Sequence, residues 1–298
     1  MPRVTAVITT FNRAEFLRPA VQSVLGQTFR DLELLVLDNS STDSTQAVVQ
    51  QFDDPRMRYI RHAPLTIGGA RNEALRHATG EFVAYLDDDD EWLPDKTRKQ
   101  VDAFAHMPEE VALVYGGFVR FDGHGREFAT HLPVLRGKVL TGLLWQDPFT
   151  GSASNPMIRA SVLHVLGGYN PSIATSEDWE LYLRLAERYD VENIPDVVVR
   201  IRKHSGPRLG DRLPDAGHVE EMVLARYRSV MSPKLQSFYL QKIGGKLCRI
   251  GASSQGRARI MEAIRIHPLN LLACGQLAVS FLGPAPYRWM HACYKRLF

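Results

Sequence analysis

The feature that most constrains the fold is the alternation of short apolar runs with amphipathic segments through the first 120 residues. Five runs have the length and the Val, Ile and Leu content of strands: residues 4–10, 32–38, 57–61, 82–86 and 111–119. Helix-like segments lie between them, at residues 14–25, 43–52, 69–78 and 94–106. Strands that alternate with helices pair in parallel, and the helices cross over the faces of the sheet. The pattern predicts an α/β fold with a Rossmann-like, mostly parallel sheet.

The second half of the chain is less regular. Residues 123–154 are rich in Gly, Pro and aromatic residues, and we interpret them as long functional loops. A helix is expected near residues 159–166, another over 177–188 and a strand over 191–201. From about residue 218 the chain has a helical pattern, with an expected break near 244–256. We therefore expect two domains, residues 1–215 and a helical region over 216–298.

Composition and cysteine usage limit the class of protein. The 298 residues are 45% hydrophobic and 23% charged, which is typical of a chain that buries a core. The sequence contains neither a run of about 18 apolar residues, as a spanning helix needs, nor a secretory pattern at its beginning. Cys248, Cys274 and Cys293 are too widely spaced for a disulfide framework or a zinc site. These features predict a cytoplasmic protein.

The charge is distributed unevenly. Residues 241–298 hold nine Lys and Arg against one acid, a net +8, whereas the other 240 residues carry −5. Within this basic region, residues 269–282 are mostly apolar and are flanked by Arg265 and Arg288. Such a segment fits an amphipathic helix at an anionic membrane surface, and a helical tail packed on the rest of the protein is the alternative. A nucleic acid partner is not expected, because no binding motif accompanies the basic residues.

Polar residues at the ends of the predicted strands indicate a binding site. Ligands of open parallel sheets bind at the carboxyl ends of the strands. One strand there runs into five consecutive carboxylates, Asp87 to Glu91. Carboxylates at close range repel one another unless a cation neutralises them, and Mg²⁺ or Mn²⁺ suits oxygen ligands. A solvated acidic turn is the alternative interpretation.

Two further segments have features of a site. Residues 67–72 place two glycines and Arg71 at a helix start, where backbone N–H groups favour anions. The segment matches neither the phosphate-binding loop of ATPases nor the dinucleotide fingerprint of dehydrogenases, which argues against both classes. Residues 176–179, Ser-Glu-Asp-Trp, open another helix. The acids there either cap the helix or supply a general base.

Taken in order, these segments resemble the family 2 inverting glycosyltransferases of GT-A fold, over roughly residues 4–204. The matching segments are Thr-Thr-Phe-Asn-Arg (9–13), Ser-Val-Leu-Gly-Gln-Thr-Phe (23–29), Leu-Asp-Asn-Ser-Ser-Thr-Asp (37–43), Ala-Arg-Asn (70–72), Gly-Glu-Phe to the acidic run (80–92), Gly-Gly-Tyr (167–169) and Glu-Asp-Trp (177–179). The resemblance implies a nucleotide-sugar donor, a divalent cation held by an Asp-X-Asp-type motif, and direct displacement at the anomeric carbon. It makes residues 1–215 the catalytic domain.

The resemblance also assigns roles on the donor side. The residues implied to bind the nucleotide are Thr9, Phe11, Asn12, Asp38, Asn39, Arg71, Asp87 and Asp88. Those implied to hold Mn²⁺ or Mg²⁺ are Asp89, Asp87 and His204. Family members usually have two aspartates where this chain has Asp38 and Asn39. An amide can accept a hydrogen bond from uracil or donate one to another base. A UDP-sugar is therefore favoured, and thymidine and guanosine donors stay open.

On the acceptor side, the resemblance makes Asp178 the general base and Glu177 a residue that binds or supports the acceptor. Trp179, next to the base, either stacks on a sugar face of the acceptor or is a core tryptophan. The implied acceptor is a sugar or a lipid-linked sugar, in assembly of surface polysaccharide or glycolipid. The enzyme would then work in the cytoplasm, at the inner face of the plasma membrane if the tail binds it. Two alternatives stay open at this point: an inactive nucleotide-sugar-binding module, and a metal-dependent phosphoryl or nucleotidyl transferase.

Overall fold

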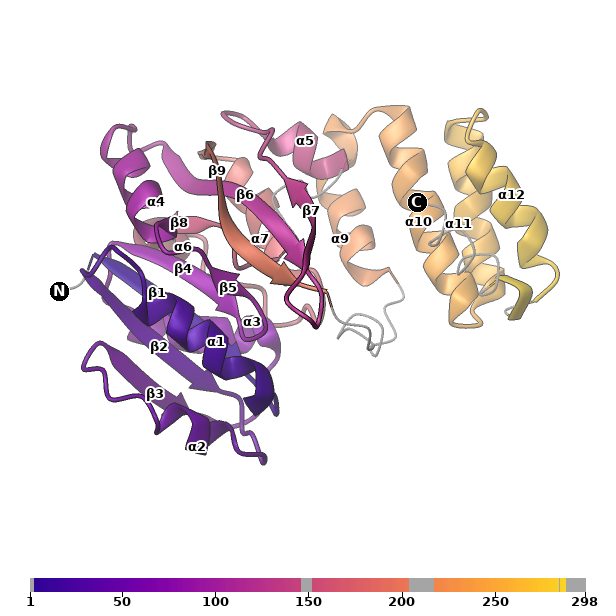
Figure 1. Ribbon diagram of the computed structural model, residues 1–298. Coiled ribbons are helices and arrows are strands. Elements are labelled where there is room, and N and C mark those ends of the chain that lie inside the picture. Colours follow the sequence, from indigo (N-terminus) through magenta and orange to yellow (C-terminus); the bar gives the residue numbers. More distant parts are fainter. Residues whose placement is uncertain (1–2, 146–151, 204–216, 284, 288–298) are drawn as a thin grey trace. The chain divides into compact units, whose positions relative to one another are not determined.

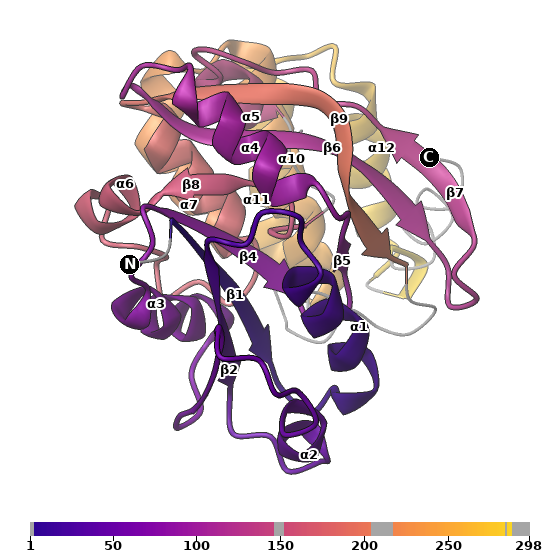
Figure 2. The same cartoon turned by 60° about the vertical axis from the view of Figure 1, so that its left-hand side comes forward.

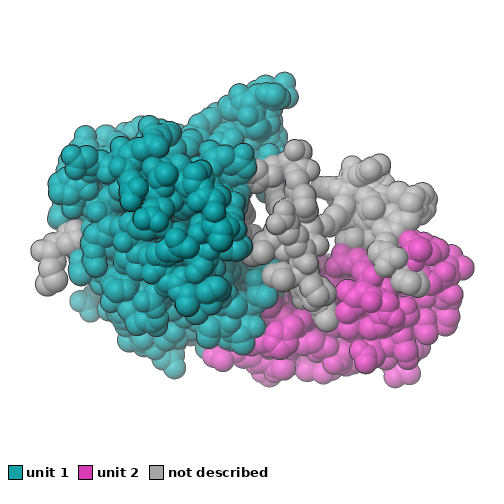
Figure 3. Space-filling model, turned by 90° about the horizontal axis from the view of Figure 1, so that it is seen from below, with its two compact units in different colours: residues 1–206 teal, residues 207–298 magenta. Residues whose placement is uncertain are grey.

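The protein is represented by a computed structural model that describes residues 3–145, 152–203, 217–283 and 285–287. The chain divides into two compact units, residues 1–206 and 207–298 (Figure 3). This division and the predicted boundary at 215/216 both fall within residues 204–216, which lie outside the described residues.

The first unit is built on one sheet, which has nine strands in the described residues (Figure 1). They are β1 (Val4–Thr10), β2 (Leu32–Asp38), β3 (Met57–Arg61), β4 (Phe82–Asp87), β5 (Glu91–Trp92), β6 (Val111–Phe121), β7 (Glu127–His131), β8 (Met157–Arg159) and β9 (Asp190–Arg202). Their order is β3-β2-β1-β4-β8-β6-β9-β5, and β7 pairs with β6. The strands β1 to β4 are parallel to their neighbours within this group, as are β6 and β9 to each other. The predicted α/β fold is confirmed.

Three strands run against this direction, which strict alternation of strand and helix did not predict. The strand β8 is antiparallel to both β4 and β6, β5 is antiparallel to β9, and β7 is antiparallel to β6. Because β8 reverses the direction between β4 and β6, the strands β1, β4, β6 and β9 all end at the same edge of the sheet. The site residues after β4 and the end of β9 are thereby brought together.

Helices cover both faces of the sheet because its central strands are apolar on both sides. The helix α1 (Ala14–Leu25) buries Leu17, Val21 and Val24 against one face, together with α4 (Lys96–Ala105) and α2 (Thr45–Val49). The helix α3 (Ile67–His77) lies on the opposite face from α1 (Figure 2). The short helices α5 (Leu140–Trp145) and α6 (Ala160–Val165) and the helix α7 (Glu177–Ala186) complete the unit.

The prediction that residues 123–154 form only long loops is wrong. This segment contains the strand β7 and the helix α5. Neither has a clear sequence signal, because β7 is mostly exposed and lacks an apolar alternation, and α5 has only six residues. Residues 146–151 lie outside the described residues.

The second unit is helical in its described residues. It contains α9 (His218–Tyr227), a short 3₁₀ turn (Arg228–Val230), α10 (Pro233–Arg249), α11 (Ser253–Ile266) and α12 (Leu271–Ser280). The helix α10 continues through Gly244 and Gly245, so the predicted break begins too early. A Cβ atom at Gly244 would lie 2.6 Å from Ile260 Cγ1, which shows that this glycine allows α11 to approach closely. None of the described helices has the length and apolarity that crossing a bilayer requires.

Candidate active site

The candidate site lies at the carboxyl ends of β1, β2 and β4 in the first unit. The parallel register pairs Thr10 with Asp38 and Thr9 with Asp87, so the three strand ends lie side by side. Thr10 Oγ1 donates a hydrogen bond of 2.7 Å to Asp88, which joins β1 directly to the acidic run. The expectation that polar strand ends meet at one edge is confirmed for these residues.

Arginines from other elements neutralise the acidic run. Arg13 Nη1 lies 3.2 Å from Asp88 Oδ1, and its other terminal nitrogen pairs with Asp89. Arg71 pairs with Asp87 at 2.9 Å, and Arg200 of β9 pairs with Glu91. The run of five adjacent carboxylates predicted an added cation. In the structure, guanidinium groups of the chain offset part of the repulsion among these carboxylates, and whether a cation offsets the rest stays a prediction.

Asp88 and Asp90 point into the protein. Burial raises the pKa of Asp88 to about 7, although the nearby Arg13 lowers it. Asp90 accepts hydrogen bonds from the hydroxyls of Ser152 and Ser154, at 2.6 and 2.7 Å, and from the backbone N–H of Arg202 at 2.9 Å. Its carboxyl group thus fastens the loop after β4 to two other segments. Burial, with the charges of Asp89 and Asp87, raises the pKa of Asp90 well above its ordinary value.

Asp87 and Asp89 keep part of their surface open, with side-chain exposures of 29% and 14%. Magnesium is commonly held by one or two carboxylates together with substrate phosphate oxygens and water. These two side chains supply oxygen donors of that kind and fit such a cation. Among the described residues, no three His, Cys, Asp or Glu gather into a complete metal site. His204, implied as a third ligand, lies outside the described residues.

Arg71 joins the donor side of the site to the helix that carries the expected base. It is 2% exposed, and its guanidinium contacts both Asp87 at 2.9 Å and Glu177 of α7 at 2.6 Å. The rings of Tyr85 and Tyr169 lie 5.7 and 5.2 Å from it and add cation–π contacts. Burial raises the pKa of Glu177 to about 7, although Arg71 lowers it. Residues from α3, β4 and α7 therefore form one buried cluster.

Asp178 lies beside this cluster at the start of α7. The helix begins after Ser176, whose φ of 63° is left-handed, and Asp178 Oδ1 accepts the backbone N–H of Trp179 at 2.8 Å. Asp178 is half-buried. Burial is the main cause that raises the pKa of Asp87, the charges of Asp89 and Asp178 raise it further, and Arg71 lowers it. Asp178 directly follows Glu177, which Arg71 links to Asp87, so the start of α7 places its carboxylate beside the buried cluster.

Trp179 points into the fold. The side chain is buried, and its indole N–H donates to the carbonyl of Leu143 at 3.0 Å. This bond ties α7 to α5. In this position Trp179 supports the helix that carries Glu177 and Asp178.

The implied nucleotide residues differ in how accessible they are. Asp38 is fully buried and accepts hydrogen bonds from the Ser41 N–H at 2.7 Å and from the Tyr59 hydroxyl. The Asn39 amide brackets the backbone of Leu65, donating to its carbonyl at 2.9 Å and accepting its N–H at 2.8 Å. Both side chains therefore build the turn after β2 from within.

The remaining nucleotide candidates lie at the end of β1. Phe11 is 53% exposed, and Thr9 is half-buried. Asn12 has a φ of 52°, and its Oδ1 accepts the Thr42 N–H at 2.7 Å, which holds the β1 turn against the β2 turn. Phe11 thus offers a ring surface beside a prebuilt polar turn.

Sequence reasoning gave no role to several residues that build the site. The main ones are Arg13, Asn72, Tyr85, Ser152 and Ser154. Asn72 donates to the Tyr169 carbonyl and accepts the Tyr169 N–H, both at 2.8 Å. Arg13 and Asn72 belong to residues 9–13 and 70–72, two of the segments that carry the family resemblance. Membership of those segments was the one sign in the sequence that these two residues help to build the site.

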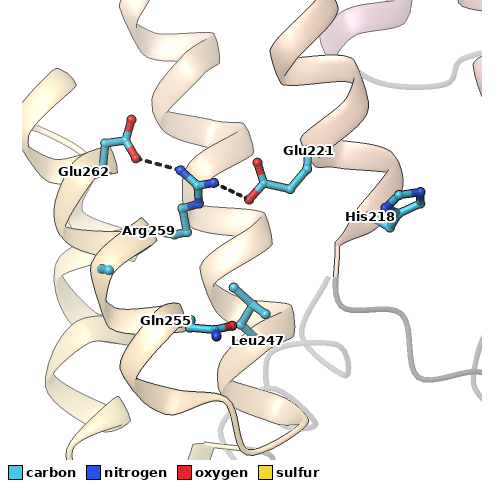
Figure 4. Close-up of a pocket in the computed structure, with 7 residues that line it drawn as sticks. His218, Glu221, Leu247, Gln255, Arg259 and Glu262 are labelled. Carbon is cyan, nitrogen blue, oxygen red and sulfur yellow. Dashed lines mark hydrogen bonds and ion pairs between the residues drawn. The ribbon is translucent and has the colours of Figure 1, made fainter.

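A cavity of about 500 Å³ in the second unit carries a different chemistry (Figure 4). Arg259 lies in its wall between Glu221, at 2.8 Å, and Glu262, at 3.1 Å. Its charge is matched within the protein, and none of the lining residues belongs to the carboxylate cluster. We therefore place the candidate site at the sheet edge of the first unit.

Comparisons with known proteins identify similar sequences and structures. The family model described as glycosyl transferase family 2 matches residues 5–167. A similar curated protein is the GalNAc(5)-diNAcBac-PP-undecaprenol beta-1,3-glucosyltransferase of Campylobacter jejuni, which is 40% identical over 115 residues, 36% of this chain and 37% of that one. The matched regions span about a third of the first curated relatives, 34–37% of their length.

Solved structures show the same fold at low identity. The structure of S. aureus TarS 1–349 in complex with UDP-GlcNAc has a TM-score of 0.64 and 16% identity, covering 99% of this chain and 92% of that one. The mannosyltransferase PcManGT from Pyrobaculum calidifontis, in complex with GDP-Man and Mn²⁺, has a TM-score of 0.58 and 20% identity, covering 97% and 83%.

Proposed function

Because the chain belongs to glycosyl transferase family 2, we propose that it transfers a sugar from a nucleoside diphosphate sugar to an acceptor hydroxyl, with inversion at the anomeric carbon. The GT-A fold and the family match cover the donor side, from β1 to the acidic run. The match ends at residue 167, before α7. The assignment of the base therefore depends on geometry.

The observation that carries the proposal is the position of Arg71. Its guanidinium contacts Asp87, on the donor side, and Glu177, next to Asp178. Inverting transfer needs a base on the face of the sugar opposite to the leaving diphosphate. Because one buried side chain contacts both Asp87 and Glu177, the donor side and the start of α7 are held together. This arrangement supports the action of Asp87 and Asp178 on the same pair of substrates.

Each residue of the cluster then has a stated task. Asp178 accepts the proton of the acceptor hydroxyl, which makes the oxygen a better nucleophile. Glu177 and Arg71 orient the start of α7. Asp87 and Asp89 would hold Mn²⁺ or Mg²⁺ against the donor diphosphate. When bound, the cation supplies Lewis-acid stabilisation of the charge that develops on the leaving group.

A UDP-sugar is the donor we favour. TarS was solved with UDP-GlcNAc and PcManGT with GDP-Man and Mn²⁺, so both nucleotide classes occur within this fold. In this proposal the half-buried turn after β2 contacts the nucleobase of the donor. Asn39 keeps one remaining lone pair and one remaining N–H beyond its two bonds to Leu65, as an amide can form up to four hydrogen bonds.

We propose a lipid-linked sugar as the acceptor, in assembly of a surface polysaccharide or glycolipid. Two relatives, from Campylobacter jejuni and Escherichia coli, are named for transfer to undecaprenyl diphosphate-linked sugars. The basic composition of residues 241–298 is compatible with an anionic acceptor.

The decisive experiment compares Asp178→Asn with the unchanged protein. We expect transfer to fall by roughly 10²–10⁴-fold, because a general base contributes about that factor. Donor affinity, measured by calorimetry with Mn²⁺ and a UDP-sugar, should stay within about twofold because Asp178 acts on the acceptor. Asp53→Asn, at an exposed aspartate of the same unit, is the matched control.

Product identity tests the alternative reactions. Release of a nucleoside diphosphate together with a glycosylated acceptor supports glycosyl transfer. Release of a nucleoside monophosphate or a phosphorylated acceptor would contradict it. Normal turnover by Asp178→Asn would refute the role of that residue, and donor binding without any transfer by the unchanged protein would favour a binding module.

A further inference from the structure

The last described helix is apolar on the side that it exposes. Residues 266–287 contain no Asp, Glu, Lys or Arg. Five large apolar side chains of this stretch are 40–79% exposed: Leu269, Leu271, Leu272, Phe281 and Leu282. We call these five residues the α12 surface.

The polar residues of α12 face inward instead. Gln276 and Ser280 are buried, and Gln276 accepts a hydrogen bond of 2.9 Å from Gln241 of α10. Asn270 caps α12 by accepting the Ala273 N–H at 3.0 Å, and it donates to Ser237 at 3.0 Å. A helix on the surface of a water-soluble protein normally buries its apolar side and exposes its polar one. The α12 surface is the reverse, and such a surface indicates a partner.

Cationic groups lie at both ends of the α12 surface. At one end, the Arg257 guanidinium lies 4.9 Å from the Phe281 ring and donates to the Ser280 carbonyl at 3.3 Å. At the other end, the exposed Arg265 lies in the last turn of α11, four residues before Leu269. The acid Glu262 is already paired with Arg259 and Arg228. An apolar surface bordered by arginines is complementary to an anionic lipid headgroup region above acyl chains.

We propose that the α12 surface docks the protein on an anionic phospholipid bilayer, with its leucines and Phe281 among the upper acyl chains and Arg257 and Arg265 among the headgroups. This inference deepens the proposed function by naming the partner of the second unit. It draws on residues of the second unit alone, so its test does not require sugar transfer.

Vesicle flotation of the full chain tests the proposal. We expect binding to vesicles that contain phosphatidylglycerol and little binding to vesicles of phosphatidylcholine alone. The double variant Leu271→Glu/Leu272→Glu should lower binding by at least about tenfold, because charges replace two exposed apolar side chains that the proposal places among the acyl chains. The matched control is Leu132→Glu, at a leucine of the first unit that is 62% exposed. Equal binding of the double variant would overturn the proposal.

A fluorescent label shows whether α12 itself enters the interface. Cys274 of α12 is exposed and Cys248 is buried, so a variant with Cys293→Ser can be labelled at Cys274 with an environment-sensitive dye. We expect a blue shift of its emission with anionic vesicles and none with neutral ones. An unchanged emission spectrum on anionic vesicles would overturn the proposal.

Two further measurements separate this proposal from others. If the α12 surface instead binds a second copy of the chain, light scattering without lipid will give a dimer mass that the double variant reduces to that of a monomer, and this result would overturn the proposal. Asp178→Asn should bind vesicles as the unchanged protein does. Loss of transfer with intact vesicle binding, or the reverse, therefore shows which of the two proposals has failed.

Discussion

At the scale of residues, Arg13 offsets part of the negative charge of the acidic run. Arg13 is the residue just before α1, and its guanidinium contacts both Asp88 and Asp89. Asp89 is also the carboxylate that we expect to bind the divalent cation. Arg13 and the cation therefore compete for the same negative charge, because each lowers the attraction left for the other.

Replacing Arg13 should strengthen metal binding in the absence of donor. We expect Arg13→Gln to bind Mn²⁺ about tenfold more tightly, since a positive charge next to Asp89 is removed. Electron paramagnetic resonance of free Mn²⁺ measures this affinity directly. Arg58→Gln, at an exposed arginine of β3, is the control and should leave it unchanged. Weaker Mn²⁺ binding by Arg13→Gln would show that Arg13 assists the site instead of competing.

At the scale of elements, α3 and α7 are fastened through consecutive residues. Arg71 of α3 reaches Glu177, and the next residue, Asn72, pairs with both backbone groups of Tyr169. The segments that carry these residues lie about a hundred positions apart in the chain. Their joint presence in the sequence is explained by this contact, which places the start of α7 over the carboxyl end of β4.

The two hydrogen bonds between the Asn72 side chain and the Tyr169 backbone can be tested by their contribution to stability. Asn72→Ala leaves the Tyr169 N–H and carbonyl without their partner, and we expect the free energy of unfolding to fall by about 1–3 kcal/mol. Asn72→Asp keeps the acceptor for the Tyr169 N–H but loses the donor to the Tyr169 carbonyl. We therefore expect it to lower the free energy of unfolding by at least about half as much as Asn72→Ala does. Denaturant unfolding followed by tryptophan fluorescence measures both. Equal stability of Asn72→Ala and the unchanged protein would show that these two hydrogen bonds do not stabilise the fold.

Long elements and strand ends were predictable, and short elements and side-chain partners were not. The bounds of β1, β2, β3 and α1 follow from apolar periodicity and agree with the structure. The strands β5 and β8 have two and three residues, too few to show any period. The pairing of Arg13 with Asp88 depends on the register between β1 and β4, and a single sequence does not specify that register.

The bonds of Asn39 illustrate the same limit within the site. Its type and position indicated contact with a base, yet both kinds of polar atom on its amide are engaged by Leu65, 26 positions along the chain. Asp38 is likewise turned inward, toward Ser41 and Tyr59. The sequence predicted that the site lies at the carboxyl ends of the strands. It did not show which polar side chains there are used to build the turn after β2.

At the scale of the whole molecule, the second unit has its own electrostatic anchor. The Glu220 carboxylate of α9 is almost fully buried and pairs with Lys242 at 3.0 Å and Lys246 at 2.7 Å, both on α10. Burial alone would raise the pKa of Glu220, but the two lysines outweigh it and lower the pKa below the ordinary value of 4.5. The ionised carboxylate therefore holds α9 against α10.

The lowered pKa of Glu220 fixes how stability depends on pH. Its contribution is fully present above the unfolded-state pKa of 4.5 and is lost as the pH falls through the lower folded-state pKa. We expect Glu220→Gln to reduce the free energy of unfolding by about 1–2 kcal/mol at neutral pH, since Lys242 is partly exposed and screened by solvent. Thermal unfolding of the full chain should show this gap closing in acid. A gap that is independent of pH would contradict the assignment.

Arg71 belongs to α3, yet its buried guanidinium joins the end of a strand to the start of another helix. The two carboxylates that it contacts cannot move apart without exposing a buried charge. If donor and acceptor bind as we propose, the spacing between them is set when the chain folds, before either reactant arrives. We then expect this fixed spacing to select among acceptors by their size.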